Sequence, residues 1–130
     1  DNMILKNNEV VGILDWELST LGHPIADFSY HCLSWRTQEA FWDEAKLKEL
    51  GVPSEREYME MYCENSGKDL SKNWEFYMAF NMFKIAGILQ GILGRVRDGT
   101  AASKHAEERG NMVFPLSEAA WSTIEENFLK

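Results

Sequence analysis

The chain has 130 residues, 45% of them hydrophobic and 26% charged, which is the balance of an ordinary globular protein long enough to bury a core. We therefore expect a single domain over residues 1–130. The formal net charge of −8, from 21 acidic and 13 basic residues, argues against a nucleic-acid partner because no basic stripe is present to displace phosphate counterions.

The first predicted element is a β-hairpin over about residues 3–15. Residues 3–6 (MILK) and 9–14 (EVVGIL) are short apolar runs, and Asn7-Asn8 between them tolerates the positive φ angles of a two-residue turn. The second run has the pattern of a buried strand that stops at an acid, Asp15. Such an acid has two interpretations: a solvated carboxylate at a strand end, or a charge held at the rim of a core for chemistry.

The predicted register brings Asn2 and Asp15 together at the open end of this hairpin. With Asn7-Asn8 as the turn, Asn2 faces Ile13, and Asp15 follows two residues later on the same face. The two backbones would lie roughly 7–8 Å apart, so an amide oxygen and a carboxylate could share a cation. Magnesium favours such oxygens and leaves the rest of its shell to water and phosphate. The alternative is that both residues cap backbone groups, as is common at hairpin ends.

A helix is expected to begin at Pro24, which suits the first helical position. Its inward residues at helical spacing are Ile25, Phe28, Cys32 and Trp35. The other cysteine is Cys63, and no CxxC motif joins the two, so they indicate core thiols in a reducing compartment. We therefore expect a cytoplasmic protein, with an organelle not excluded.

Residues 37–53 fit either a short helix or a packed loop, with Phe41, Trp42, Leu47 and Leu50 as the apolar residues. Ser54, with Glu57 three residues later, has the spacing of a capping box and predicts a helix through Tyr62. Asn65-Ser66-Gly67 is expected to end that helix.

The longest predicted helix runs from about Asn73 to Asp98. Because Phe76, Phe80 and Phe83 add to its main apolar face, it is apolar nearly all round, which is typical of a helix in the centre of a bundle. Three glycines are spaced to let a neighbour pack closely against it: Gly87, Gly91 and Gly94.

The segment 78–93 of this helix is the one candidate membrane span. A lysine at its middle, Lys84, would cost roughly 2.5–3.5 kcal/mol in a bilayer, so we interpret the segment as a buried helix of a soluble protein with no membrane partner.

A short helix over about 101–109 and a last helix after Pro115 complete the chain. The inward residues of the last helix are expected to be Leu116, Ala120, Ile124 and Phe128. The predicted fold class is mainly α with a small N-terminal β-hairpin (α+β), the helical bundle covering about 24–130.

The stretches DNMIL and VVGILDWELSTLGHPIADFSY resemble the C-terminal lobe of the aminoglycoside phosphotransferase and choline kinase-like family, which has a protein-kinase-like fold. The similarity is closest to the phosphotransferase domains fused to certain acyl-CoA dehydrogenases. In that family a loop H-G-D-x-x-x-x-N leads into a hairpin ending in I/L-D-W/F-E. Asn2 matches the loop asparagine, and Asp15-Trp16-Glu17 match the hairpin end. His23 departs from the wider family, which usually has Asp there.

The resemblance implies that Asn2 and Asp15 are metal ligands of a phosphotransferase that uses ATP and Mg²⁺ to phosphorylate a hydroxyl group of a small molecule. In the family spacing the catalytic base lies five residues before the asparagine, which falls upstream of Asp1, and the nucleotide lobe is upstream too. We therefore expect this chain to be a fragment of the C-terminal lobe and inactive alone. The alternative is a non-catalytic interaction or regulatory module derived from that fold.

Several further residues have a functional and a structural interpretation. Glu17 could face the metal, the substrate or solvent. Residues 35–50 correspond to a variable region that shapes the acceptor pocket in the family, so Trp35, Arg36 and Trp42 are candidate substrate contacts, although core packing is the alternative for each. Asp27 either favours the helix dipole or braces the catalytic loop. A chain of this kind would also expose apolar surface, which predicts self-association into a homo-oligomer.

Overall fold

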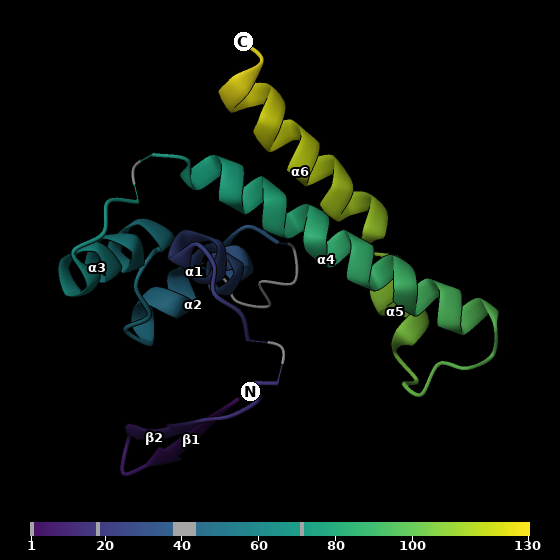
Figure 1. The fold of residues 1–130 in the computed structure, drawn as a ribbon, viewed down its shortest axis with the longest axis horizontal. Helices are drawn as coiled ribbons and strands as arrows, with labels where there is room; N and C mark the ends of the chain where they lie inside the picture. Colours follow the sequence, from purple (N-terminus) through teal and green to yellow (C-terminus); the bar gives the residue numbers. More distant parts are fainter. Residues whose placement is uncertain (1, 18, 38–43, 71) are drawn as a thin grey trace.

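The computed structural model describes residues 2–17, 19–37, 44–70 and 72–130, and these form a two-stranded hairpin followed by helices (Figure 1). The strands are β1 (Met3–Lys6) and β2 (Glu9–Ile13). The helices are α1 (Pro24–Cys32), the 3-10 turn η1 (Leu33–Trp35), α2 (Glu44–Glu49), α3 (Glu55–Ser66), α4 (Trp74–Arg97), α5 (Ala106–Gly110) and α6 (Val113–Phe128). The predicted fold class, mainly α with a small N-terminal hairpin, is confirmed.

The hairpin turn is formed as predicted. Asn7 and Asn8 have φ angles of 52° and 63°, the left-handed values that a two-residue hairpin turn requires and that asparagine tolerates. Beyond the turn, Lys6 pairs with Glu9 and Leu5 pairs with Val10.

The predicted register is wrong past this point because β2 contains an extra residue. Ile4 pairs with Gly12 rather than with Val11, so the strand is bulged between Val10 and Gly12. Met3 then lies opposite Ile13, and the amide of Leu14 donates to the carbonyl of Asn2 at 2.8 Å. Asn2 therefore faces Leu14 instead of Ile13.

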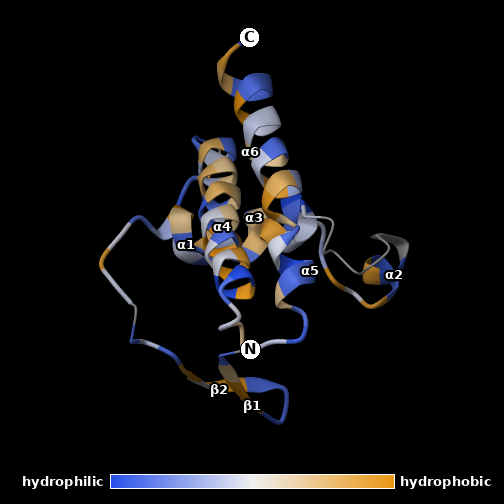
Figure 2. Ribbon diagram, turned by 90° about the vertical axis from the view of Figure 1, so that its right-hand side faces the viewer, coloured by the Kyte–Doolittle hydropathy of each residue, from blue (hydrophilic) through white to orange (hydrophobic). Residues whose placement is uncertain are grey.

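The interpretation of β2 as a buried strand is also wrong in this chain. Val10, Val11, Ile13 and Leu14 are each about half exposed, from 52 to 56%. Both views place the hairpin apart from the helices (Figures 1 and 2), and neither described core cluster contains a hairpin residue. A two-stranded sheet has no second layer of its own to cover its apolar side chains.

The core lies where α1, α3 and α6 meet α4. Its main cluster joins the buried side of α1 to the first half of α4, with Leu70 and Met78 fully buried between them. The predicted inward residues Ile25, Phe28 and Cys32 are buried, and Trp35 is half-buried. A second cluster of Ala86, Leu89 and Leu116 continues the core along α4 and α6.

Helix α3 begins and ends as its sequence predicts. The Ser54 hydroxyl accepts from the Glu57 amide at 3.3 Å, and the Glu57 carboxylate accepts from the Ser54 amide at 2.8 Å, which completes the capping box. The pKa of Glu57 is lowered mainly by the bond from the Ser54 amide, and also by a bond of 2.7 Å that the Ser54 hydroxyl donates to the same carboxylate. Gly67 then ends the helix in the left-handed conformation, with φ 66°.

Helix α4 is buried on one side only, so its expected central position is only partly correct. Phe76 and Phe80 are each 47% exposed and Phe83 is 71% exposed. The glycine prediction is wrong: a Cβ added at Gly87, Gly91 or Gly94 meets no atom within 4 Å, so no described neighbour packs closely there. The close approach occurs instead at Gly110 of α5, where an added Cβ would lie 2.3 Å from Leu93 Cδ2.

By length and composition alone, α4 could cross a membrane. Of the 18-residue segment of α4 that meets this criterion, 28% is buried in the described fold. Along its length it packs against α1, α5 and α6. Core helices of other proteins meet the same length criterion, so this property is weak support for a membrane span.

Helix α6 begins at Val113, two residues before Pro115. Leu116 and Ala120 are buried as predicted, whereas Phe128, expected inward, is 49% exposed because α6 extends beyond the helices that could cover its last turn (Figure 1).

Candidate functional site

The open end of the hairpin brings Asn2 and Asp15 into direct contact. The Asn2 side-chain amide donates to Asp15 Oδ2 at 3.0 Å, and both residues are exposed. The predicted proximity of these two side chains is therefore confirmed, although the register that was expected to produce it is not.

The backbone at Asp15 explains how the contact forms despite the bulge. With Asn2 opposite Leu14, simple alternation would point Asp15 to the other face of the sheet. Asp15 instead has φ 64°, a left-handed conformation that turns the chain as it leaves β2. Holding an aspartate in the left-handed conformation costs about 1 kcal/mol or more of folding free energy, so other contacts must stabilise this turn.

Trp16 supplies one of those contacts. Its indole N–H donates to the Ile13 carbonyl at 2.7 Å, and its own carbonyl accepts from the Ser19 amide at 2.9 Å. The ring thus folds back on the end of β2 and fixes the direction in which the chain leaves Asp15. Glu17 is exposed beside it.

The oxygen atoms at this end of the hairpin fit a magnesium ion that keeps most of its shell for water and phosphate. Asp15 Oδ1 and the Asn2 amide oxygen have no protein donor among the described residues, and a half-turn of the Asn2 amide would present both oxygens to one cation. No cluster of three or more His, Cys, Asp or Glu residues suited to a metal occurs in the part of the chain that the structure describes. Two oxygen-bearing side chains suit magnesium better than zinc, which needs about four ligands.

The start of α1 is built around His23. Its ring nitrogen Nδ1 accepts from the Ile25 amide at 3.3 Å, and its ring stacks on Tyr77 of α4 at 5.1 Å. His23 is thus the N-cap residue of α1. Asp27 lies exposed in the first turn, where its charge favours the helix dipole, and has no ion-pair partner among the described residues.

A buried polar contact that sequence reasoning missed ties α1 to α4. The Asn81 side-chain amide donates to the Ala26 carbonyl and to the Ser29 hydroxyl, both at 2.8 Å. Asn81 is 1% exposed, and its Oδ1 has no partner among the described groups. A polar residue inside an otherwise apolar helical run was the available signal for this contact.

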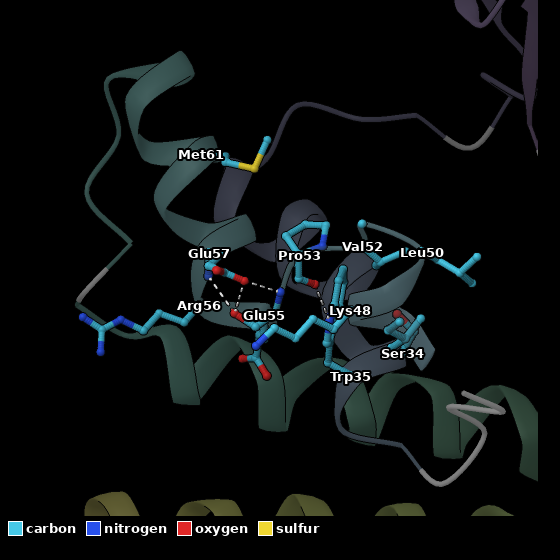
Figure 3. A pocket seen from close by; sticks show the side chains of 13 residues that line it. Ser34, Trp35, Lys48, Leu50, Val52, Pro53, Glu55, Arg56, Glu57 and Met61 are labelled. Atoms are coloured by element: carbon cyan, nitrogen blue, oxygen red, sulfur yellow. Dashed lines mark hydrogen bonds between the residues drawn. The ribbon is translucent and has the colours of Figure 1, made fainter. Parts of the chain in front are cut away.

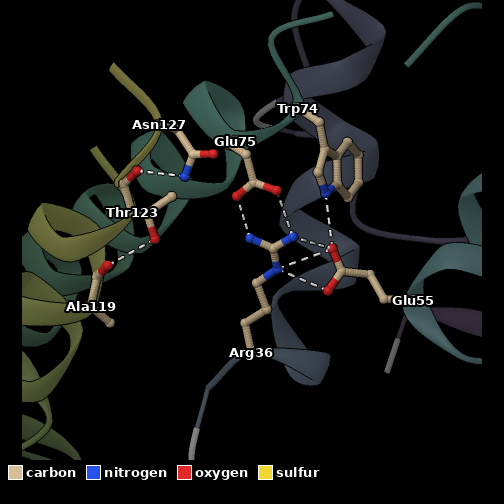
Figure 4. Close-up of polar contacts among 7 residues, drawn as sticks. All are labelled: Arg36, Glu55, Trp74, Glu75, Ala119, Thr123 and Asn127. Carbon is tan, nitrogen blue, oxygen red and sulfur yellow. Dashed lines mark hydrogen bonds and ion pairs between the residues drawn. The ribbon is translucent and has the colours of Figure 1, made fainter. Parts of the chain in front are cut away.

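Arg36 lies in a charged network that joins η1, α3 and α4 (Figure 4). Its guanidinium binds the Glu55 carboxylate with two bonds of 2.7 and 2.8 Å and also binds the carboxylate of Glu75. The Trp74 indole N–H donates to Glu55 at 2.9 Å. The hydrogen bonds to Glu75 are the main reason that the pKa of Arg36 is raised. Because all three of its nitrogens are engaged, Arg36 has little capacity left for a substrate, and its substrate-contact role stays a prediction.

An open pocket of about 1270 Å³ lies between η1, the residues after α2 and the start of α3 (Figure 3). Trp35 forms one wall, held by its indole N–H on the Pro53 carbonyl at 3.2 Å and by stacking on Tyr58. The other lining residues include Leu47, Lys48, Leu50, Val52 and Met61. Trp42, the other candidate substrate contact, lies outside the described residues.

Cys32 and Cys63 are free thiols, and Cys32 is fully buried. Burial, aided by the Glu55 charge and opposed by Arg36, raises the pKa of Cys32 to about 12. A thiol with that pKa is not a nucleophile at neutral pH.

Comparison with known proteins shows a resemblance to a family of phosphotransferases. Residues 1–62 match the sequence model described as the phosphotransferase enzyme family. The chain is 41% identical over 128 residues to mouse acyl-CoA dehydrogenase family member 10, covering 93% of this chain and 12% of that protein. It is 34% identical over 134 residues to human acyl-CoA dehydrogenase family member 11, covering 98% and 17%.

Among solved structures, the chain is similar to a proposed aminoglycoside phosphotransferase from Ralstonia eutropha JMP134. The TM-score is 0.84 and the identity 43%, over 97% of this chain and 40% of that one. The chain thus spans less than a fifth of the two dehydrogenase relatives and two fifths of the solved structure.

Proposed function

We propose, from the similarity of residues 1–62 to the phosphotransferase enzyme family, that the complete protein is an ATP- and Mg²⁺-dependent phosphotransferase acting on a hydroxyl group of a small molecule. The observation that carries the proposal is the contact of 3.0 Å between Asn2 and Asp15 at the end of the hairpin. In such an enzyme the catalytic base and the nucleotide lobe precede the loop asparagine, so we propose that turnover requires the complete protein.

In this proposal Asp15 and Asn2 hold the magnesium, and Trp16 keeps Asp15 in place. The metal would neutralise charge on the transferred phosphoryl group. The chain's own contribution is positional: the bulge, the left-handed φ of Asp15 and the Trp16 bond to the Ile13 carbonyl together fix where the carboxylate points. Positioning of this kind is most of what a protein supplies to phosphoryl transfer.

For the acceptor we propose a small hydroxylated molecule, contacted by Trp35 and Trp42 and by Glu17 near the metal. The open pocket beside Trp35 supports this proposal because it lies in the region that the family resemblance assigns to acceptor binding. Of the proposed acceptor contacts, Arg36 has the least support, since its guanidinium is already paired with the carboxylates of Glu55 and Glu75. Asp27, whose carboxylate has no described partner, is proposed to brace the catalytic loop.

The test is the ATP-dependent turnover of the complete protein with Asp15→Asn and, separately, with Asn2→Ala. We expect Asp15→Asn to lower the rate by several orders of magnitude, because an amide neither carries the charge nor binds magnesium as a carboxylate does. Glu9→Gln is the matched control, an exposed acid at the turn end of the same hairpin. Normal turnover by Asp15→Asn would refute the assignment.

The second candidate is a non-catalytic interaction module, favoured by the exposed apolar side chains of the hairpin. It predicts a protein partner that covers this hairpin, and substitution of Val11 by Lys should then abolish capture of that partner while leaving the helices intact. For the compartment we propose the cytoplasm, on the two free thiols.

A further inference from the structure

Two neighbouring residues, Trp35 and Arg36, bind the same short segment of the chain, residues 53–55. The Trp35 indole N–H donates to the Pro53 carbonyl at 3.2 Å (Figure 3). The Arg36 guanidinium donates to the Glu55 carboxylate at 2.7 and 2.8 Å (Figure 4). We name this pair of contacts the two-point attachment. Because it has two points, it fixes the direction of the segment as well as its distance from η1.

The attached segment is part of the wall of the pocket beside Trp35. Pro53, Ser54 and Glu55 line that pocket together with Ser34 and Trp35. Pro53 and Ser54 lie between α2 and α3 and belong to neither helix, so the hydrogen bonds of a regular helix do not fix their position. Contacts with other parts of the chain must therefore determine where this part of the wall stands.

Arg36 also connects this wall to α4. Its guanidinium binds the Glu75 carboxylate, and the indole N–H of the buried Trp74 donates to Glu55 at 2.9 Å. Helix α4 contributes residues to both described core clusters. The pocket wall is therefore anchored to the core of the fold through Glu55 and Arg36, and not only to the loop that carries it.

We infer that Arg36 is a positioning residue of the acceptor pocket: through Glu55 it holds the wall beside Trp35 in the geometry that binds a ligand. The inference rests on the proposed function only in taking that ligand to be the phosphate acceptor. Arg36 acts without touching the acceptor, since two carboxylates already pair with its guanidinium. A wall that is already in place loses little conformational freedom when a ligand binds, which raises the affinity.

The chemistry of the lining selects the probe for a test. The lining carboxylates of Glu55 and Glu57 are already bonded, the first to Arg36 and Trp74 and the second to Ser54. Much of the remaining lining is apolar: Leu47, Leu50, Val52, Pro53 and Met61. The alcohol n-hexanol matches this lining, because it joins a hydroxyl group to a neutral apolar chain. Its binding requires neither ATP nor magnesium, so it is measured independently of Asn2 and Asp15.

The experiment is an NMR titration of the isotopically labelled chain with n-hexanol, followed through the backbone amides of the pocket residues. In the unmodified chain their shifts should saturate. Arg36→Met should raise the dissociation constant at least roughly fivefold, and Arg36→Lys, which keeps the charge but not the planar fork, should recover part of the loss. Trp35→Phe keeps a ring and removes the N–H that binds Pro53, so it should also weaken binding.

Gly110→Ala is the matched control for loss of stability. It is expected to destabilise the chain at α5, and Gly110 is not among the residues that line the pocket. Under conditions in which every variant remains folded, Gly110→Ala should therefore bind n-hexanol as the unmodified chain does.

Three results would overturn the inference. Shifts of the pocket amides that do not saturate would mean that the pocket does not bind the probe. An unchanged dissociation constant for Arg36→Met would mean that the wall keeps its position without Arg36. Equal weakening by Gly110→Ala would mean that lost stability, and not lost position, is the cause. If n-hexanol binds as expected but Asp15→Asn turns over normally, the positioning role of Arg36 is supported and only the proposed function is refuted.

Discussion

Replacing Arg36 with methionine tests whether the network in Figure 4 holds the helices together. The substitution keeps an unbranched side chain and removes the positive charge of Arg36, which pairs with both Glu55 and Glu75. Two carboxylates would then face each other without a counter-ion, and the hydrogen bonds from the guanidinium to both would be lost.

The expected loss follows from how deeply the three groups lie. Their side chains are 27, 19 and 31% exposed for Arg36, Glu55 and Glu75. Breaking a fully buried ion pair costs about 3–5 kcal/mol, whereas an exposed pair contributes about 0.2–1 kcal/mol. For partly exposed groups such as these we expect the free energy of unfolding to fall by about 2 kcal/mol.

Urea unfolding followed by circular dichroism measures this loss through the midpoint. Arg56→Met is the matched control, because Arg56 also pairs with one glutamate, Glu60 at 3.0 Å, but is 88% exposed. That control should change stability by no more than about 0.5 kcal/mol. Adding Glu55→Gln and Glu75→Gln to Arg36→Met should restore part of the loss by removing the uncompensated charges.

Two results would refute this reasoning. A loss from Arg36→Met no larger than that from Arg56→Met would mean that solvent screens the network fully. A triple variant less stable than Arg36→Met alone would mean that like-charge repulsion is not the cause. The hydrogen bonds to Glu75 raise the pKa of Arg36, so its ion pairs should persist at alkaline pH. The stability loss caused by Arg36→Met should therefore be as large at alkaline pH as at neutral pH.

Four further outcomes are expected. Ser54→Ala removes the N-cap of α3 and should cost about 1 kcal/mol in urea unfolding; no change would mean that α3 does not need its cap. Gly110→Ala should lower the thermal midpoint, because the new Cβ would lie 2.3 Å from Leu93 Cδ2, and a raised midpoint would show that Leu93 moves aside freely. At pH 8 a thiol reagent should label Cys63 and leave Cys32 until the chain unfolds. Because the pKa of Cys32 is about 12 when folded and 9.0 ordinarily, stability should fall as pH rises above 9, and a flat urea midpoint from pH 8.5 to 10 would contradict this.

Local chemistry made the predicted turns and helix ends accurate. The two asparagines specify the hairpin turn because they tolerate positive φ, and the structure places both in that conformation. Ser54 and Glu57 specify the start of α3 because their side chains satisfy amides within the same turn. The contact between Asn2 and Asp15 was predicted from the same hairpin. It forms although the predicted register is wrong, because the chain turns at Asp15 and brings its side chain back toward Asn2.

The predictions that failed depend on neighbours far along the chain. The apolar pattern of β2 predicts burial, but no described element covers the hairpin, and its valines remain about half exposed. The glycines of α4 allow close packing without specifying a partner, and the described fold supplies none. Asn81 could be found in the sequence as a polar residue in an apolar run, but its partners on α1 could not.

The sequence by itself determined the order of elements, the turn, the helix caps and the two residues proposed to hold magnesium, because these depend on interactions within a few residues or across one hairpin. Only the tertiary structure decided that Arg36 is occupied by Glu55 and Glu75, which are 19 and 39 residues away. It also decided which side of α4 is left open. Both depend on how helices distant in sequence come together, since the same side chain can be buried, paired or exposed according to what packs against it.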